Sequence, residues 1–178
     1  MCSSDLIYEL PFTRNEFVRG WRLSGILTSM TGNPFTVFDG FDQTGSGVTG
    51  KNAPTRPNLV PSGDQNPVVG GVNGWFDVNQ FSLSPVGTFG NLGRNTVIAP
   101  GMTAINAALL KRTAISRISE QFVLEFRAEV GNVLNHPSYG LPTNLLYNNG
   151  TTRNPQAGVI TNTNAASRNV QFALKATF

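Results

Sequence analysis

Apolar and polar or small side chains alternate along residues 168–178. The apolar set lies on one face of an extended chain and consists of Val170, Phe172, Leu174, Ala176 and Phe178. An alternating segment of ~9–11 residues is typical of a strand that crosses a membrane with one face toward lipid. It fits a half-buried strand of a soluble β-sandwich equally well, so this segment alone leaves both classes open.

Three earlier segments show the same alternation and are predicted to be strands, at about 5–12, 18–31 and 102–114. The apolar positions of the first two are Leu6, Tyr8, Leu10 and Phe12, and Trp21, Leu23, Gly25 and Leu27. Polar residues at 13–17 separate these two strands and predict a short turn. In the third segment the alternation is weaker, because alanine and leucine occupy both faces.

The stretch 118–134 fits two periodicities. Apolar residues recur every four positions, as on an amphipathic helix, at Ile118, Phe122, Phe126, Val130 and Leu134. The same stretch also alternates as a strand, with Phe122, Leu124, Phe126, Ala128 and Val130 against Glu125, Arg127 and Glu129. Gly131 would weaken a helix by up to ~1 kcal/mol relative to alanine, which favours the strand only slightly.

Two long stretches, 32–101 and 135–167, have no sustained period and are rich in glycine, proline and asparagine. The first contains seven aromatic residues, whereas disordered segments are poor in aromatics. These aromatics are Phe35, Phe38, Phe41, Trp75, Phe76, Phe81 and Phe89. We therefore expect a folded loop that packs on itself, of a length common on the external side of a large barrel.

Composition keeps a membrane barrel possible and makes other classes less favourable. Charged residues are 13% of the 178 residues, about half the usual share, while the hydrophobic fraction is only 39%. The apolar runs are too short for a transmembrane helix, but a barrel needs no such run. The net charge of +3 comes from scattered basic residues, so nucleic-acid binding is not expected.

The sequence offers little support for catalysis, metal binding or a cofactor. Cys2 and His136 are the only residues of their types and form no cluster with metal-ligand spacing. Glu125 with Glu129, or His136 with Ser138 and an aspartate, could be combined as catalytic groups, but strand geometry merely aligns the first pair and nothing orients the second group. We predict that the protein is not an enzyme and that it has no catalytic, cofactor or metal site.

Three stretches together resemble the C-terminal end of TonB-dependent receptor barrels, particularly the Oar-like group with a carboxypeptidase-regulatory-like N-terminal domain. They are Gly20-Trp-Arg-Leu-Ser-Gly-Ile-Leu-Thr28 with Gly32-Asn-Pro-Phe-Thr-Val37, Trp75-Phe76 with Gly87-Thr-Phe-Gly-Asn-Leu-Gly-Arg-Asn95, and Phe126-Arg-Ala-Glu-Val-Gly-Asn-Val-Leu-Asn-His-Pro-Ser-Tyr-Gly140 with Phe178. No plug domain, TonB box or signal peptide is recognisable. The resemblance therefore implies that 1–178 is one partial barrel domain, a fragment of a longer receptor.

The resemblance implies an all-β fold, with about five antiparallel strands of an outer-membrane β-barrel at 5–12, 18–31, 102–114, 120–134 and 168–178. The long loops 32–101 and 135–167 would then be extracellular, and the turns periplasmic. A periplasmic aromatic girdle would include Phe12, Trp21 and Phe122. Glu125, Arg127 and Glu129 would face the lumen, where they contact a plug or solute or, as we favour, form a solvated charge ladder. Phe172, Leu174 and Phe178 would belong to the barrel-assembly signal.

The implied function is energised uptake of a scarce ligand across the bacterial outer membrane. The expected partners are outer-membrane lipid, the barrel-assembly machinery, and the TonB system acting through a plug. Two alternatives remain: a non-transporting surface barrel for adhesion or matrix export, and a soluble secreted β-sandwich. An open sheet with edges at 5–12 and 168–178 is expected, because five strands are too few to close a membrane barrel.

Overall fold

We describe the protein from a computed structural model, which describes residues 2–11, 15, 18–47, 55–117 and 120–178. The chain forms two compact units. The sheet unit consists of Met1–Met30, Met102–Ser138 and Ala165–Phe178, and the loop unit consists of Thr31–Gly101 and Tyr139–Asn164. Within the described residues, no helix is long and apolar enough to cross a membrane.

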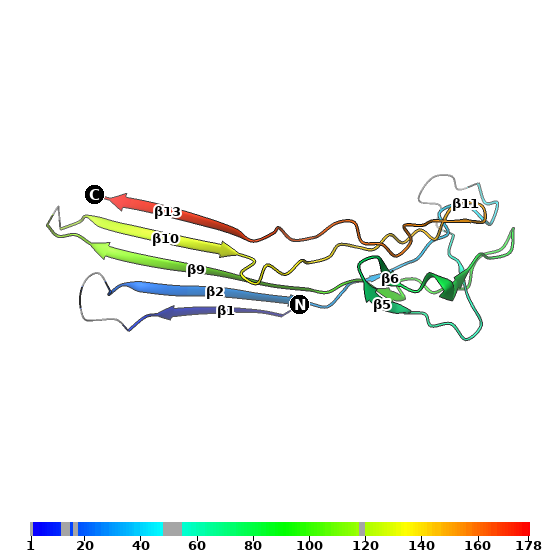
Figure 1. Ribbon diagram of the computed structural model, residues 1–178, viewed down its shortest axis with the longest axis horizontal. Coiled ribbons are helices and arrows are strands. Elements are labelled where there is room, and N and C mark those ends of the chain that lie inside the picture. Colours follow the sequence, from blue (N-terminus) through cyan, green and yellow to red (C-terminus); the bar gives the residue numbers. More distant parts are fainter. Residues whose placement is uncertain (1, 12–14, 16–17, 48–54, 118–119) are drawn as a thin grey trace. The chain divides into compact units, whose positions relative to one another are not determined.

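The sheet unit contains one antiparallel sheet of five strands (Figure 1). Its strands, in spatial order, are β1 (Cys2–Glu9), β2 (Trp21–Met30), β9 (Met102–Ala114), β10 (Val123–Gly131) and β13 (Asn169–Thr177). The stretch with two periodicities, 118–134, therefore contains a strand. A strand places Glu125 and Arg127 on the face opposite the apolar residues. A helix would leave both charged side chains beside the apolar stripe, and this difference explains the outcome.

The observed strands differ most from the expected segments at β1, which is shifted, and at β10, which is shorter by three residues at each end. β1 begins at Cys2, three residues earlier than predicted, and ends at Glu9 instead of continuing to 12. The pairing of β1 with β2 explains the early start, since Cys2 lies opposite Ser29. β9 has the bounds 102–114 given by the sequence, while β2, β10 and β13 are shorter than 18–31, 120–134 and 168–178.

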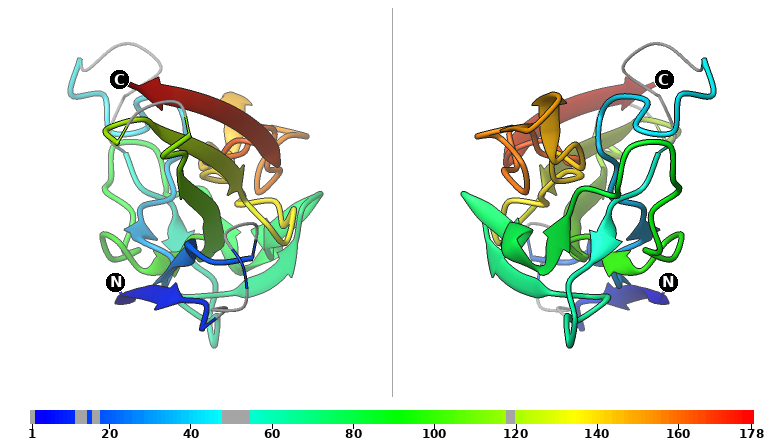
Figure 2. Two further views of the ribbon diagram at one scale, coloured as in Figure 1. Left: turned by 90° about the vertical axis from the view of Figure 1, so that its left-hand side faces the viewer. Right: turned by 90° about the vertical axis from the view of Figure 1, so that its right-hand side faces the viewer.

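Both outer strands of the sheet are open edges. β1 pairs only with β2, and β13 only with β10. Figure 2 looks along the strands and shows blue β1 and red β13 on opposite sides of the other strands. Every residue of the two edge strands is exposed. The unpaired backbone groups of these edges can accept further strands.

Both long connections leave the sheet at one end. Met30 of β2 lies opposite Met102 of β9, and Gly131 of β10 lies opposite Asn169 of β13. The chain between each pair belongs largely to the loop unit. The strand order thus sends the two long segments out from the same end of the sheet, while the short connections lie at the other end.

The loop unit is built from short elements. They are β3 (Pro34–Phe35), β4 (Asn58–Leu59), β5 (Val68–Gly71), β6 (Gly74–Phe76), the 3-10 helix η1 (Val78–Gln80), β7 (Phe81–Ser82), β8 (Val97–Ile98), β11 (Tyr147–Asn149) and β12 (Thr152–Arg153). They pair as four two-stranded ladders: β3 with β8, β4 with β7, β5 with β6, and β11 with β12. The stretches without sequence periodicity therefore contain strands too short to produce one.

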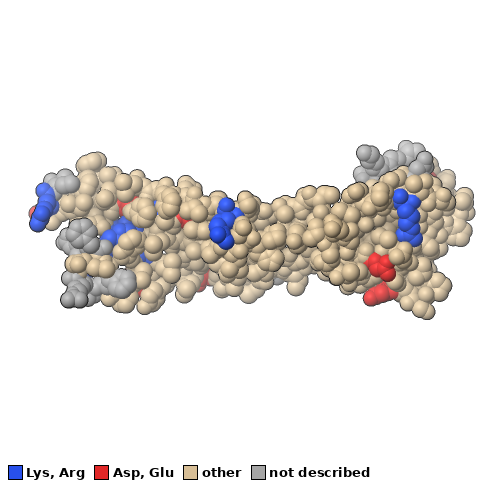
Figure 3. Space-filling view, in the orientation of Figure 1, with Lys and Arg blue, Asp and Glu red and all other residues tan. Residues whose placement is uncertain are grey.

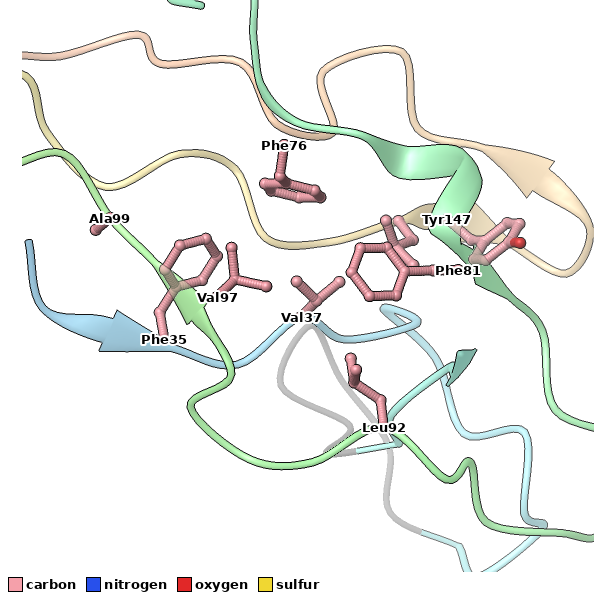
Figure 4. Close-up of a cluster of buried hydrophobic side chains, with 9 residues drawn as sticks. Phe35, Val37, Phe76, Phe81, Leu92, Val97, Ala99 and Tyr147 are labelled. Carbon is pink, nitrogen blue, oxygen red and sulfur yellow. The ribbon is translucent and has the colours of Figure 1, made fainter. Parts of the chain in front are cut away.

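The loop unit has its own hydrophobic core (Figure 4). Its buried members are Phe35, Val37, Phe76, Phe81, Leu92, Val97, Ala99, Leu146 and Tyr147. The rings of Phe35, Phe76 and Phe81 pack in series at centroid separations of 6.0 Å. Seven aromatics indicated a packed loop, and these three are buried. Phe41 and Trp75 pack partly against the cluster, Phe38 is half-buried, and Phe89 is exposed.

Candidate functional site

The five-stranded sheet has one predominantly apolar face, which we call the apolar face. Residues opposite one another in register project to the same side of a sheet, so the strand pairing defines its members. Its large apolar residues are Leu6, Tyr8, Trp21, Leu23, Leu27, Ile105, Leu109, Leu124, Phe126, Val130, Val170, Phe172 and Leu174. Phe126 and Phe172 stack across the β10 and β13 pair at 6.2 Å between ring centroids.

The opposite side of the sheet, which we call the polar face, carries nearly all the charge. The five strands contain nine charged residues, and the register places eight of them here: Asp5, Glu9, Arg22, Arg112, Glu125, Arg127, Glu129 and Lys175. Four are acidic and four are basic, so this face has no net charge. Ile7, Ile26 and Leu110 are among the apolar residues that share it.

Charges on the polar face are arranged with opposite signs as neighbours. Arg22 pairs with Glu9 at 2.5 Å, and Arg127 pairs with Glu129. Glu125 lies opposite Arg112 on one side and Lys175 on the other. In the view of Figure 3 the charged residues form small, separate groups on a mostly uncharged surface. This arrangement stabilises cross-strand pairs without creating a field of one sign.

Lys111 is the one charged strand residue on the apolar face. It lies opposite Trp21 near the end of β9, and its ammonium Nζ is 5.8 Å from the centroid of the Trp21 ring. The Nζ also donates a hydrogen bond to the carbonyl of Arg19. A lysine near a strand end can keep its charged group at a polar boundary while its alkyl stem covers apolar surface.

A hollow of about 400 Å³ lies over the middle of β2 and β9, the end of β10 and the start of β13. Small residues, including Ser24, Ala108 and Gly131, leave space between larger side chains. The larger polar groups around it are those of Asn106, Arg127, Glu129, Asn169 and Gln171. Of these five residues, only Arg127 and Glu129 are predicted from the sequence. Gln171 lies between Val170 and Phe172, so the same alternation of polar and apolar residues could have indicated it.

The expected aromatic and terminal residues fall at different places. Phe12 lies outside the described residues. Trp21 begins β2, whereas Phe122 precedes β10 and is buried against Phe178, with 5.1 Å between ring centroids. Phe172 and Leu174 lie on the apolar face of β13. The structure brings Phe122 and Phe178 together, but it does not place Trp21 in that contact.

Asp39 is a buried carboxyl group in the loop unit that the sequence did not single out. Its exposed fraction is 0%, and neither carboxyl oxygen has a hydrogen-bond partner among the described residues. Burial raises the pKa of Asp39 from 3.8 to about 7, because desolvation disfavours the charged form. By contrast, hydrogen bonds from Thr44, then Gly47 and Ser46, hold the pKa of the half-buried Asp42 below its usual value.

Metal ligands do not gather in the described part of the chain: no three side chains of His, Cys, Asp or Glu are placed to hold an ion together. The candidate functional surface is therefore the polar face of the sheet, on which acidic and basic residues are equal in number.

Comparison with known families agrees with the two-faced antiparallel sheet. The family model described as "Outer membrane beta barrel domain" matches residues 2–171. A search of curated proteins and of solved structures gave no significant match. The match covers nearly the whole chain, with four of the five strands and the first three residues of β13. It indicates localisation in the bacterial outer membrane. The chain belongs to the outer-membrane β-barrel domain family.

Proposed function

We propose that this chain forms part of the wall of a TonB-dependent receptor barrel that takes up a scarce ligand. The observation that carries the proposal is the separation of charge across the sheet, with eight of nine charged strand residues on the polar face. In this proposal the apolar face contacts lipid and the polar face lines the lumen. Glu125, Arg127 and Glu129 are then lumen-facing residues.

The cost of placing charges in lipid supports this orientation. An arginine or lysine on the lipid face costs ~2–4 kcal/mol at the bilayer midplane and less near the interfaces. The reverse orientation would place several such charges in lipid. It would also place Phe172 and Leu174, which are 68% and 69% exposed, in a wet lumen. Lysine at position 111 is compatible with the proposed orientation, because it lies near the strand end.

The loop unit supports a receptor role. Long folded segments leave one end of the sheet, as extracellular loops of receptor barrels do, and they have a core of their own. A folded unit with its own core can present a binding surface. The same feature would suit the alternative of a non-transporting barrel that serves adhesion or matrix export.

The TonB assignment is supported by the sequence resemblance. Its motifs fall on β2, on the loop segment 87–95 and on β10. The partners in this proposal are outer-membrane lipid, the barrel-assembly machinery, and the TonB system acting through a plug domain. We assign no catalytic reaction and no nucleic-acid partner to this chain.

Cysteine labelling in outer membranes tests the orientation of the two faces. In a Cys2→Ser background, Ala173→Cys should react with a water-soluble maleimide, because position 173 lies on the polar face. The neighbouring Leu174→Cys should react far more slowly, because its thiol would lie in lipid. Equal labelling of the two positions in folded protein would contradict the barrel-wall proposal.

Energy dependence separates uptake from a passive surface role. Cells that make the protein should accumulate its ligand from the medium, and a protonophore should abolish the accumulation without reducing binding at the cell surface. Deletion of the host TonB protein should have the same effect as the protonophore. Surface binding with no energy-dependent accumulation would instead support the non-transporting barrel.

A further inference from the structure

A small pocket in the loop unit brings together two arginines and an aromatic ring. Its volume is about 260 Å³, and its lining includes Thr36, Phe38, Arg56 and Arg94. None of these lining residues is acidic. The two arginines come from segments far apart in the sequence, so only the folded loop unit places both at one pocket.

Arg56 is fixed in place by the chain that passes beside it. Its Nη1 donates to the carbonyl of Leu92 at 2.5 Å, and the backbone N–H of Leu92 donates to the carbonyl of Pro57 at 3.1 Å. Gly90 allows this close approach, since a Cβ there would lie 1.9 Å from the Arg56 carbonyl oxygen. The contact with Leu92 uses one of the five N–H donors of the guanidinium.

Arg94 is positioned by the residue that follows it. Asn95 adopts a φ of 54°, and its backbone N–H donates to Oγ1 of Thr36 at 2.9 Å. The Thr36 hydroxyl in turn donates to Oδ1 of Asn95 at 3.1 Å. Asn144, in the second long segment, donates to the Thr36 carbonyl at 2.8 Å, so Thr36 is also held from that segment. Arg94 itself is exposed, so its guanidinium is accessible from solvent.

The chemistry of the lining defines a ligand class. A guanidinium presents paired N–H donors that match the oxygens of a carboxylate or phosphate. Two guanidinium groups at one pocket favour an anion more than a single one does. The Phe38 ring offers an apolar surface beside these donors. We infer that the pocket binds a small oxyanion, carboxylate or phosphate, that is attached to an apolar group.

This inference concerns binding by the loop unit and does not require energised uptake. The oxyanion can come from a free solute or from the phosphate of a lipid headgroup. If the receptor proposal also holds, the pocket is a place where an incoming ligand is held. A protein that binds the anion without importing anything would contradict only the uptake proposal.

Calorimetric titration of the full folded chain in a neutral sugar detergent tests the pocket, with phenyl phosphate as the probe. Phenyl phosphate should bind and phenol should not, because the arginines select the charged group. Arg94→Gln should raise the dissociation constant roughly tenfold or more, as expected for loss of a charge-assisted bidentate contact. Arg94→Lys should recover part of the affinity. Arg168→Gln removes the same charge from an exposed position of the sheet unit and should leave binding unchanged.

Thermal unfolding of each variant verifies that it is folded. Competition by vesicles that contain lipid A identifies the source of the anion: displacement of phenyl phosphate supports a headgroup, and no displacement supports a free solute. The inference is overturned if folded wild-type protein does not bind phenyl phosphate. It is also overturned if Arg94→Gln and Arg168→Gln reduce the affinity equally, since binding would then depend on net charge alone.

Discussion

The sheet unit and the loop unit bury their apolar side chains in different ways. Among the buried hydrophobic residues of the described part, only Phe122 belongs to the sheet unit. The loop unit holds the others, around Val37, Phe81 and Leu146. The sheet instead exposes Phe172 and Leu174 by more than two thirds. Its apolar residues therefore need a partner that the loop unit does not need, and we propose that this partner is lipid.

The two units also satisfy their backbone groups differently. The sheet does so through long regular ladders, with β9 paired along most of its length on both sides. The loop unit uses short ladders and side-chain bonds, such as Asn91 Oδ1 accepting from Leu59 and Asn58 Oδ1 accepting from Asn91. Asparagine and glycine are common there because asparagine side chains form hydrogen bonds with irregular backbone and glycine readily adopts a positive φ.

The strongest test of this difference is removal of a fully buried ring of the loop unit. Phe81→Ala deletes a fully buried side chain and should destabilise the loop unit by ~3–5 kcal/mol, while leaving the sheet assembled. Limited proteolysis should then cut within 31–101, while heat-modifiable gel migration stays as in the wild type. Phe89→Ala is the control, since Phe89 is 77% exposed and should tolerate the change. Joint loss of both units would show that they fold as one.

Asp39 makes the stability of the loop unit depend on pH. Its folded pKa of about 7 exceeds the ordinary 3.8, so ionisation destabilises the folded state. The penalty is absent below about pH 4, grows between pH 4 and 7, and is constant above, with an upper bound of about 4 kcal/mol. Asp39→Asn should thus stabilise the loop unit at pH 8 much more than at pH 4, as measured by protease resistance on heating. A benefit independent of pH would refute this explanation.

A charge placed on either face of β13 tests the role of the sheet. Phe172→Arg should reduce assembly in the outer membrane, because arginine in lipid costs ~2–4 kcal/mol near the midplane. The neighbouring Gln171→Arg adds the same side chain to the polar face and should assemble normally. The folded fraction in outer membranes, measured by heat-modifiable migration, distinguishes them. Equal assembly of both variants would indicate that neither face contacts lipid.

The smallest expected effect concerns Phe178. Phe178→Ala removes the ring contact with Phe122 and should destabilise the end of the sheet by ~1 kcal/mol. If Phe178 also belongs to the assembly signal, as the family resemblance implies, the folded fraction should fall as well. Phe178→Tyr keeps the ring and should be tolerated. A wild-type folded fraction for Phe178→Ala would exclude the assembly role.

The sequence determined the two-sided character of the sheet. Alternate residues of a strand project to opposite faces, so the spacing of Glu125, Arg127 and Glu129 fixes their common side once the segment is a strand. For 118–134 that choice needed more than periodicity, because apolar residues also recur at helical spacing. The strand bounds followed the pattern closely at 102–114 and 168–178 and less closely elsewhere, since pairing partners decide where a strand begins and ends.

Tertiary structure alone decided what the long loops contain. Residues 36–39 lie beside 144–147, as Phe38 accepting from Leu146 and donating to Asn144 shows, and no local pattern encodes so distant a pairing. The aromatic content of 32–101 predicted a packed loop, but not that Phe81 is buried while Phe89 is exposed. The burial of Asp39 and the presence of Arg56 and Arg94 at one pocket also depend on contacts between distant segments. Local alternation can specify the faces of a strand, whereas an irregular unit is specified only when all its segments pack together.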